Sequence, residues 1–227
     1  MLGKDSGGIN VVVQTRLIIM AKHPTPGEVK TRLTPSLTPE EAAGLYVAFT
    51  DDCVAQSIGD HWQTHLVIHP ARLSSYFDER YPEVDGVHPQ TGDDLSNRMQ
   101  NAFSLFLPGS GPVLMRSSDS PCMSRDLIQE ATLALHADAD AVISADQGGG
   151  YALIGLKELQ ADLFNIEMST PSVFNATVDR MQQAGLRVRV LDSCRDVNLM
   201  SDLEDLKQTL ETTPELCPAT AAWLRRR

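Results

Sequence analysis

Cysteine is scarce in this chain, and its few occurrences form no motif. The 227 residues include four cysteines, with no C-x-x-C pair and no histidine at the spacing of a zinc finger. Isolated cysteines of this kind are typical of reduced thiols in a cytoplasm. We therefore expect a cytoplasmic protein with four free thiols, at Cys53, Cys122, Cys194 and Cys217.

Long hydrophobic runs and an excess of positive charge are also missing. The apolar run over residues 17–21 is too short to cross a membrane, and no stretch near the first residue has the length of a signal peptide. Lys and Arg number 19 against 30 Asp and Glu, which gives a formal net charge of -11 at pH 7. A nucleic-acid-binding domain normally has a basic face. We therefore expect neither a membrane nor a nucleic acid as a partner, whereas an anionic small molecule needs only a local basic pocket.

No internal repeat, low-complexity tract or linker divides the chain. We expect an N-terminal extension over residues 1–14 and one domain over residues 15–227. Strand-like segments alternate with amphipathic helical ones, which predicts an α/β domain with a mainly parallel sheet. Strands are expected at 15–21, 64–69, 84–88, 112–116, 141–144, 151–156 and 186–191, and helices at 38–57, 73–80, 93–106, 124–136, 170–185 and 201–210. In such sheets ligands bind outside the carboxyl ends of the strands.

The positive charge that is present gathers after the first strand. Residues 16–32 contain four basic side chains and one acid, Glu28, so this segment carries a local charge of +3. It is not a Walker A motif, because Val29 stands where that motif has glycine, and it has too few glycines for a Rossmann fingerprint. A stiff Pro/Gly turn with converging cations can hold phosphates, although a solvated basic loop is the alternative. The candidates for phosphate binding are Lys22, Pro26, Gly27, Lys30 and Arg32.

A carboxylate follows the strand at 112–116. Asp119 lies in a Ser-Ser-Asp-Ser-Pro turn, where it can bind Mg²⁺ or Mn²⁺ and bridge to a substrate diphosphate. Alternatively, it only hydrogen-bonds the turn. Ser124 is already a good N-cap for the next helix, which favours the metal ligand. We therefore expect Asp119 to be both catalytic and metal-binding.

Two further segments add candidates for nucleotide binding. Three glycines at 148–150 precede a strand, which excludes a dinucleotide loop, but Gly149 and Gly150 let the backbone approach a ligand or simply connect two elements. Near position 93 two acids start a helix, and capping explains one of them. Arg98 on that helix can pair with an acid or contact a ligand. Asp94, Arg98, Gly149 and Gly150 therefore join the predicted site.

Six motifs in order resemble one family from residue 17 to about residue 206. They are residues 21–33, then Gln90 with 92–95 and 98–99, then 118–121, 149–156, 169–171, and 196–198 with 202–203. The family comprises small bacterial proteins of the GT-A type, variously described as glycosyltransferases, arsenosugar biosynthesis glycosyltransferases and molybdenum-cofactor-guanylyltransferase-like nucleotidyltransferases.

The resemblance implies a three-layer α/β sandwich with a mixed, mostly parallel sheet between helices. It implies that the loop after the first strand holds a nucleotide and that Asp119 ligates a divalent metal ion. Our first expectation is a glycosyltransferase that uses a nucleotide-sugar donor, and the alternative is a nucleotidyltransferase that releases pyrophosphate. The acceptor is a small molecule that the sequence does not identify, and no pattern indicates an oligomeric state.

Two positions depart from the pattern of that family. The family usually has Asp before Gly-Gly-Tyr, where this chain has Gly148. It also usually has Asp-Val-Asp, where this chain has Asp196-Val197-Asn198. Asp146 lies two residues earlier, roughly 6 to 7 Å away along an extended chain, so we expect no replacement without loop rearrangement. Metal binding is then expected to depend on Asp119 and on the substrate's phosphates. A further alternative is a nucleotide-binding protein that has lost catalysis.

Overall fold

The computed structural model describes residues 14–109, 111–160, 162–168 and 170–226, so residues 1–13 of the predicted extension lie outside the described residues. The described strands form one sheet in the order β3-β2-β1-β4-β6-β5-β7. Strand β6 is antiparallel to β4 and β5, and the other neighbours are parallel. The strands are β1 (Thr15–Lys22), β2 (Trp62–His69), β3 (Gly86–Pro89), β4 (Val113–Ser117), β5 (Ala141–Ala145), β6 (Tyr151–Leu156) and β7 (Val188–Leu191). The predicted mixed, mostly parallel sheet is confirmed.

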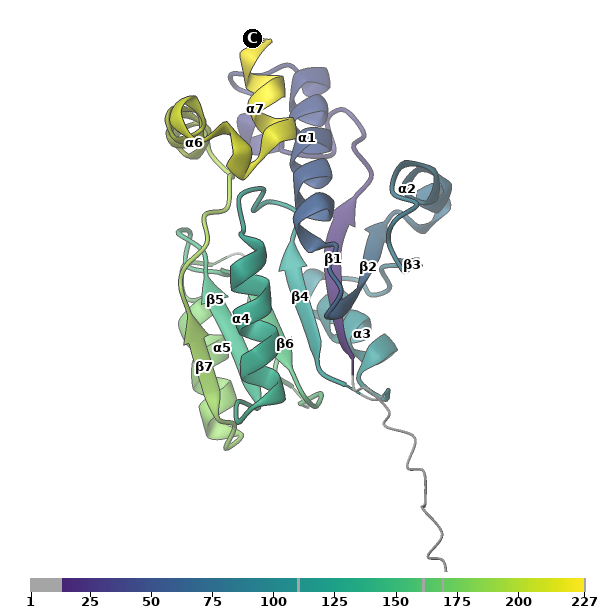
Figure 1. Cartoon of the computed structure of the whole chain (residues 1–227), viewed down its shortest axis with the longest axis vertical. Coiled ribbons are helices and arrows are strands. Elements are labelled where there is room, and N and C mark those ends of the chain that lie inside the picture. The colour runs from purple at the N-terminus through teal and green to yellow at the C-terminus, as the bar shows by residue number, and fades with distance from the viewer. Residues whose placement is uncertain (1–13, 110, 161, 169, 227) are drawn as a thin grey trace, which may run out of the picture.

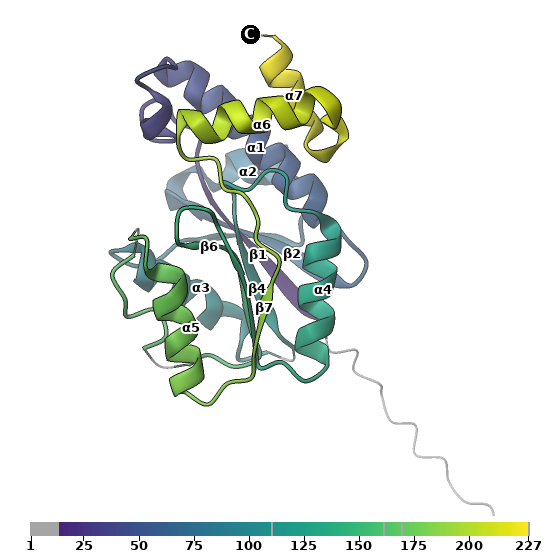
Figure 2. The same cartoon turned by 90° about the vertical axis from the view of Figure 1, so that its left-hand side faces the viewer.

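Helices cover both faces of this sheet. They are α1 (Pro39–Ser57), α2 (Ser74–Arg80), α3 (Leu95–Phe106), α4 (Arg125–His136), α5 (Val173–Gln183), α6 (Met200–Thr212) and α7 (Pro218–Arg225). Three short 3-10 turns, Thr31–Leu33, Ala71–Leu73 and Pro214–Leu216, complete the described elements. Figure 2 shows α3 and α5 on one side of the sheet and α4 on the other, which confirms the three-layer sandwich. In Figure 1, α6 and α7 lie with α1 beyond the carboxyl ends of β1 and β4.

The central strands are buried on both faces, which explains their nearly continuous apolar sequences. Successive side chains of a strand point to opposite faces. Leu17 and Leu114 accordingly pack in the cluster under α4, whereas Ile18 and Met115 pack in the cluster under α3 and α5. Continuous apolar runs of this kind are typical of strands covered by two helix layers.

Local capping fixes where the helices begin. At α1, the Thr38 hydroxyl accepts a hydrogen bond from the Glu41 N–H at 3.2 Å, and the Glu41 carboxylate accepts one from the Thr38 N–H at 2.7 Å. This is the reciprocal capping box of a helix start. Ser124 caps α4 by accepting from the Leu127 N–H at 3.2 Å. The ends of the predicted elements shift by one to three residues, which is the usual scatter of such boundaries.

Helix α7 is absent from the sequence-based prediction. Its first turn is held by Asp52 of α1, a buried residue whose carboxylate accepts hydrogen bonds from the Ala219 N–H at 2.9 Å and from the Thr220 N–H at 2.8 Å. The Thr220 hydroxyl donates to the same carboxylate at 2.6 Å. A cap supplied by another helix leaves no N-cap signal in the local sequence, and the prediction did not use the helix-start signal of Pro218 at the first helical position.

The cysteines also differ from the prediction. Cys122 and Cys217 form a disulfide, whereas Cys53 and Cys194 are free and buried. The expectation of four free thiols was wrong for this pair. Tertiary packing brings the turn after β4 to the start of α7, with Cα atoms 5.4 Å apart, and a separation of 95 residues along the chain gives no sign of it.

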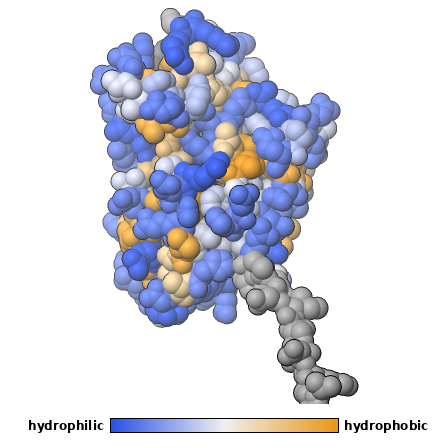
Figure 3. Space-filling model, viewed as in Figure 1, coloured by the Kyte–Doolittle hydropathy of each residue, from blue (hydrophilic) through white to orange (hydrophobic). Residues whose placement is uncertain are grey.

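The outer surface is ordinary for a folded domain. The face seen in Figure 3 is mostly hydrophilic, with apolar side chains in scattered patches. Single exposed apolar residues such as Leu133 of α4 need no special explanation. None of the helices in the described part of the chain is long and apolar enough to cross a membrane.

Candidate functional site

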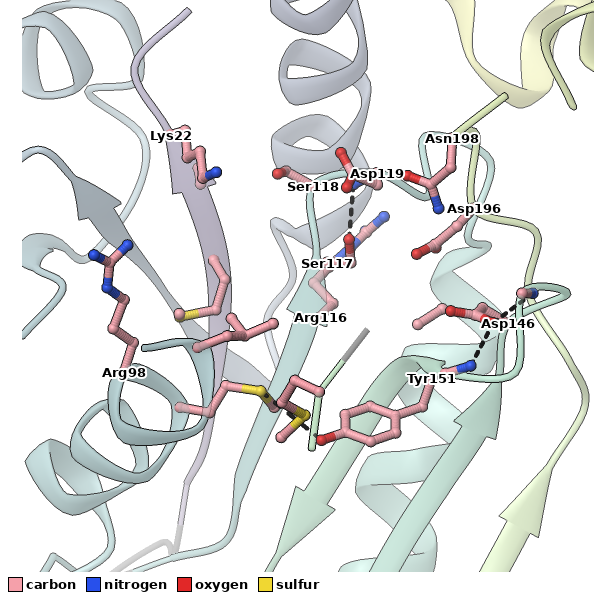
Figure 4. Close-up of a pocket in the computed structure, with 18 of the residues that line it drawn as sticks. Lys22, Arg98, Arg116, Ser117, Ser118, Asp119, Asp146, Tyr151, Asp196 and Asn198 are labelled. Atoms are coloured by element: carbon pink, nitrogen blue, oxygen red, sulfur yellow. Dashed lines mark hydrogen bonds between the residues drawn. The ribbon is translucent and has the colours of Figure 1, made fainter. Parts of the chain in front are cut away.

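A cavity of about 710 Å³ opens where β1 and β4 end, at the edge of the sheet where the sequence predicts a ligand. Its walls come from the loop after β1, the start of α3, the turns after β4 and β5, the segment before α5 and the segment before α6. Figure 4 shows that its two sides differ: Lys22 and Arg98 lie on one side, and the acids lie on the other. These acids are Asp119, Asp146 and Asp196.

Most of the predicted site residues line this cavity. They are Lys22, Lys30, Arg32, Asp94, Arg98, Asp119 and Gly150. Pro26, Gly27 and Gly149 lie outside its walls. Gly149 has φ +88°, and a Cβ there would lie 2.1 Å from the Pro171 carbonyl oxygen, so this glycine is required for the turn itself. The binding roles of all these residues stay predictions.

The start of α3 is the clearest case of a capping role beside the cavity. The Asp94 carboxylate accepts a hydrogen bond from the Asn97 N–H at 2.7 Å and therefore serves as the N-cap of α3. Arg98 donates from Nε to the Gly92 carbonyl at 3.0 Å, which aims the rest of its guanidinium at the cavity. Thr170 also lines the cavity, and Ser169 lies outside the described residues.

Two cations on the cationic side have no carboxylate partner among the described residues. Lys22 is exposed at the end of β1, and within the described ranges neither Lys22 nor Arg98 forms an ion pair with a carboxylate. Lys22 pairs in register with His69 of the neighbouring strand. Burial, followed by the charges of Arg98 and Lys22, lowers the pKa of His69. This corner of the molecule is therefore electropositive although the whole chain is acidic.

Lys30 is different from the other cations because it is buried and paired. Its side chain is only 4% exposed, and its ammonium lies 2.5 Å from the Asp119 carboxylate. The same ammonium donates to the Val197 carbonyl at 2.7 Å and lies 5.2 Å from the centre of the Phe49 ring. Lys30 thus connects the loop after β1 to the turn after β4 and to the segment before α6.

The acidic side contains one carboxyl group with a strongly altered pKa. Asp196 is held by a hydrogen bond from the Ser120 hydroxyl. Burial raises the pKa of Asp196 to about 7, and the charges of Asp119 and Asp146 add to the effect. A carboxyl group that is buried beside like charges favours its protonated form. A cation bound on this side of the cavity would therefore be stabilised by the acids.

Asp146 reaches the cavity because its loop is a tight turn. Its N–H donates to the Gly150 carbonyl at 3.0 Å, and its Oδ1 accepts from the N–H groups of Gly148 at 2.7 Å and Gly150 at 2.8 Å. The estimate of roughly 6 to 7 Å applies to an extended chain, whereas residues 146–150 form a turn. The turn between β5 and β6 brings Asp146 to the same wall as Asp196, although its side chain is engaged in holding the glycines.

Two residues that shape the site were missed by sequence reasoning. The buried Tyr46 hydroxyl accepts from the Lys22 N–H at 2.9 Å and shares a hydrogen bond with the Ser118 hydroxyl at 2.7 Å, which ties the ends of β1 and β4 to α1. Arg116 is 1% exposed and donates to the Ser120 carbonyl at 2.7 Å, so it supports the turn that carries Asp119. In the sequence, Tyr46 is one member of the apolar face of a helix, and Arg116 is a single charge within an apolar strand.

Carboxylate oxygens are the donors that Mg²⁺ and Mn²⁺ prefer, and Asp119 is 35% exposed toward the cavity. However, no three carboxylate, imidazole or thiol groups among the described residues lie close enough to hold a metal ion. The residues present therefore fit a metal ion only if further oxygen ligands come from a bound substrate.

Comparison with known proteins defines the class first. A solved structure from Desulfovibrio desulfuricans G20, described as a "putative nucleotide-diphospho-sugar transferase", is similar to this chain with a TM-score of 0.86 and 32% identity, over 93% of this chain and 94% of that one. The fold of 4-diphosphocytidyl-2C-methyl-D-erythritol synthase from Anaerococcus prevotii is also similar, with a TM-score of 0.58 and 14% identity, over 89% and 99% of the two chains. The fold is thus that of nucleotidyltransferases and nucleotide-diphospho-sugar transferases.

A match between the sequence and a family model identifies the family of this chain. Residues 54–170 match the family model DUF2064, described as an uncharacterized protein conserved in bacteria, and the chain belongs to this family. A 2-phospho-L-lactate guanylyltransferase from Methanothermobacter thermautotrophicus is 29% identical over 182 residues, which cover 78% of each protein. These relationships agree with the GT-A type family that the motifs resemble.

Proposed function

We propose that this protein is a nucleotidyltransferase that joins a nucleotide to a small-molecule acceptor and releases pyrophosphate. The observation that carries the proposal is a single cavity in which unpaired cations face carboxylates across the ends of β1 and β4. The guanylyltransferase relative and the cytidyl-transferring enzyme of similar fold support it. They favour nucleotidyl transfer over our first expectation, glycosyl transfer from a nucleotide-sugar.

The cationic side is proposed to hold the triphosphate. Lys22 and Arg98 supply charges without a carboxylate partner, and Arg32 lies exposed at the same cavity. Each cation near a phosphate contributes up to about 4 kcal/mol of gross Coulomb attraction at an effective dielectric constant of 20. Desolvation offsets part of this attraction. Three such residues can hold a nucleotide in spite of the negative net charge of the chain.

In the proposed reaction, an oxygen of the acceptor attacks the α-phosphorus of a nucleoside triphosphate. The bond from that phosphorus to the bridging oxygen breaks, and pyrophosphate leaves with the electron pair. Negative charge develops on the leaving group, where Lys22 and Arg32 can stabilise it. In the free protein, Lys30 links the loop after β1 to the Asp119 turn, so the two halves of the site are already held together before a nucleotide binds.

A Mg²⁺ or Mn²⁺ ion on Asp119 is part of the proposal. Such an ion supplies Lewis-acid stabilisation of the phosphate oxygens. Asp119 would hold it together with oxygens of the nucleotide, since the protein alone offers no closed set of ligands. The Lys30 ammonium, which now neutralises Asp119, would shift toward the phosphates when the ion binds.

Two other functions remain as outcomes of the same test. The 32% identical relative described as a nucleotide-diphospho-sugar transferase favours glycosyl transfer as the second candidate. Gly148 and Asn198, which replace acids of the resembled family, motivate a nucleotide-binding protein without catalysis. A cytoplasmic location and the absence of membrane or nucleic-acid partners are likewise predictions.

The experiment is a thermal-shift screen followed by product analysis. Nucleoside triphosphates and nucleotide-sugars are tested with and without Mn²⁺, and a ligand at 100 times its Kd should stabilise the fold by about 2.7 kcal/mol. Stabilisation by a triphosphate with acceptor-dependent release of pyrophosphate supports the proposal. Release of a nucleoside diphosphate from a nucleotide-sugar identifies glycosyl transfer, and binding without product on prolonged incubation identifies the non-catalytic protein. No stabilisation by any nucleotide contradicts all three.

A further inference from the structure

The cysteines are far apart in the sequence but lie together in space around the Asp119 turn, residues 117–122. The Cys53 thiol donates to the Ser120 carbonyl at 3.6 Å, and the Ser120 side chain hydrogen-bonds the Cys194 thiol. Burial raises the pKa of Cys53 to about 12 and the pKa of Cys194 to about 11. Both therefore stay protonated at pH 7 and are poor nucleophiles. The thiol–disulfide chemistry of this cluster lies with the other two cysteines, which form the disulfide.

The disulfide joins the Asp119 turn to the C-terminal helix. Cys122 is the last residue of this turn, and Cys217 directly precedes α7 as its N-cap residue. Helix α1 holds the same end of α7, through the Asp52 carboxylate and through the Gln56 amide, which donates to the Leu216 carbonyl at 2.7 Å. Figure 1 shows α7 beside α1, beyond the carboxyl end of β4. The disulfide is thus a covalent connection between the candidate site and α7.

The packing of α7 also reaches the site through an apolar cluster. This cluster joins the loop after β1, helices α1, α6 and α7, and the segment before α6, with Leu33, Leu37, Phe49, Val197, Leu206, Cys217 and Ala221 among its buried members. The Val197 N–H donates to the Asp119 carbonyl at 2.9 Å, and the Val197 carbonyl accepts from the Lys30 ammonium at 2.7 Å. A change in how α7 packs is therefore transmitted to the residues that hold Lys30 and Asp119 together.

We propose that the disulfide between Cys122 and Cys217 is a redox-controlled clamp, which holds α7 against the Asp119 turn and whose reduction by a dithiol loosens both. Cys122 is partly exposed and Cys217 is fully buried, so a thiolate of the reductant attacks the Cys122 sulfur. The bond to the Cys217 sulfur breaks, and Cys217 leaves as a thiolate that takes up a proton. The second thiol of the reductant then displaces Cys122 from the mixed disulfide, and the reductant is oxidised to a disulfide. A small-molecule disulfide reverses these steps.

The clamp acts on one side of the cavity. A disulfide across 95 residues limits how far its two segments separate in partly unfolded states, so its reduction lets α7 leave α1 more often. The Asp119 carboxylate is then held less firmly, whereas Lys22 and Arg98 lie on the opposite side. The predicted cytoplasm is a reducing compartment, where disulfides are usually transient or redox-sensing. A clamp that opens and closes fits such a compartment better than a permanent structural bond.

The test compares the oxidised and the dithiothreitol-reduced full chain by hydrogen exchange. Alkylation after denaturation first counts the thiols, which should be two in the oxidised protein and four after reduction. Exchange in residues 117–122 and 218–225 should rise at least about tenfold on reduction, whereas residues 15–22 of β1 should change less than about twofold. Unchanged exchange in either of the first two segments would overturn the inference. So would four free thiols in protein treated with oxidised glutathione.

Variants assign the effect to this disulfide. Cys122→Ser should exchange at α7 as fast as the reduced wild type and should no longer respond to dithiothreitol. Cys194→Ser is the matched control, because Cys194 belongs to the same cluster but forms no disulfide, and it should keep the full response. A Cys122→Ser protein that still responds to the reductant would contradict the clamp. If this variant fails to fold, the two redox states of the wild type decide alone.

A binding measurement extends the clamp to the proposed function, on which this part rests. Nucleotide affinity is measured for both redox states after excess reductant is removed, with the nucleotide that the thermal-shift screen identifies. Reduction should lower the Mn²⁺-dependent gain in affinity at least about fivefold and change the affinity without Mn²⁺ less than about twofold. Equal losses with and without Mn²⁺ would contradict an action on the acidic side.

The two proposals fail in different ways. If no nucleotide binds, the proposed function fails, and hydrogen exchange still decides whether the clamp exists. If exchange at α7 is the same in both redox states, the clamp fails, whatever the nucleotides do.

Discussion

The two charged sides of the cavity differ in how their charges are compensated. On the cationic side, Lys22 is exposed and Arg98 has no ion pair among the described residues. On the acidic side, Asp119 is neutralised by the buried Lys30, and the pKa of Asp196 rises to about 7 through burial and its acidic neighbours. The first side has cations that no carboxylate neutralises, whereas on the second side the proposed metal ion would have to replace Lys30 at Asp119. Under the proposed function, nucleotide binding and transfer would depend on different sides, and substitutions can separate the two.

The largest effect is expected at the acidic side. Asp119→Asn removes the negative charge that faces both Lys30 and the proposed metal ion. The transfer rate should fall at least about 100-fold, the scale of losing one preorganised electrostatic group. The Mn²⁺-dependent part of the nucleotide thermal shift should vanish as well. Pyrophosphate release and thermal shift with and without Mn²⁺ check both statements, and a Mn²⁺-dependent shift that survives in Asp119→Asn refutes the metal assignment.

The cationic side should affect nucleotide affinity more than stability. Lys22→Ala and Arg98→Ala should each weaken nucleotide binding about tenfold, equivalent to about 1.4 kcal/mol. The free energy of unfolding should change little in Lys22→Ala, because Lys22 forms no ion pair within the described ranges. It should fall by no more than about 1 kcal/mol in Arg98→Ala, which loses the hydrogen bond to the Gly92 carbonyl. Calorimetric titration and urea unfolding measure the two quantities. Lys207→Ala, a change at an exposed lysine on α6, is the charge control, and equal losses in all three variants would mean that only overall charge matters.

The raised pKa of Asp196 predicts a pH effect on stability. Its pKa of about 7 in the folded protein exceeds the ordinary aspartate value of 3.8. Between pH 3.8 and pH 7, the unfolded chain has therefore lost a proton that the native protein keeps. This contribution to stability is fully present below pH 3.8 and is lost as the pH rises toward 7. His65 has the opposite influence, since burial followed by the His88 charge lowers its pKa to about 4.

Because these two contributions oppose each other, the variant must be compared with the wild type. Asp196→Asn should make the free energy of unfolding rise more steeply from pH 4 to pH 7 than it does in the wild type. Urea unfolding in metal-free buffer at several pH values measures the slope. Identical slopes in the two proteins would mean that Asp196 is not buried beside like charges.

The smallest effect concerns the connection between the two sides. Tyr46→Phe removes the hydroxyl that joins the Lys22 N–H to Ser118, and should lower the free energy of unfolding by about 1 to 2 kcal/mol. Nucleotide affinity should change less than twofold. Tyr76→Phe is the control, because the structure records no hydrogen bond of the Tyr76 hydroxyl among the described residues. Equal stability losses in the two variants would mean that the hydrogen bonds of the Tyr46 hydroxyl do not stabilise the fold.

Much of the fold could be predicted from the sequence because local signals agree with it. The alternation of apolar strands with capped amphipathic helices gives the sandwich, and the capping box at Thr38 is readable directly. The Cys122–Cys217 disulfide and the cap that Asp52 supplies to helix α7 were not predictable, since both depend on contacts between distant segments. No local pattern encodes such a contact.

The candidate site was predictable in its charges but not in their pairing. The cations after β1 and the acid after β4 stand out because they follow apolar strands. Lys30 is buried against Asp119, whereas Lys22 is exposed. This difference depends on how the loop after β1 folds over α1. The position of Asp146 at the cavity was not predictable, because it depends on the turn in which the Asp146 N–H bonds to the Gly150 carbonyl.

Pyrophosphate release by the full chain tests the central claim most directly. The protein is incubated with each nucleoside triphosphate and Mn²⁺ in the presence of candidate small-molecule acceptors, and pyrophosphate is measured against reactions without acceptor. Nucleotidyl transfer predicts pyrophosphate that appears only with an acceptor and is lost in Asp119→Asn. A triphosphate that binds at the cationic side but yields no pyrophosphate with any acceptor would contradict it.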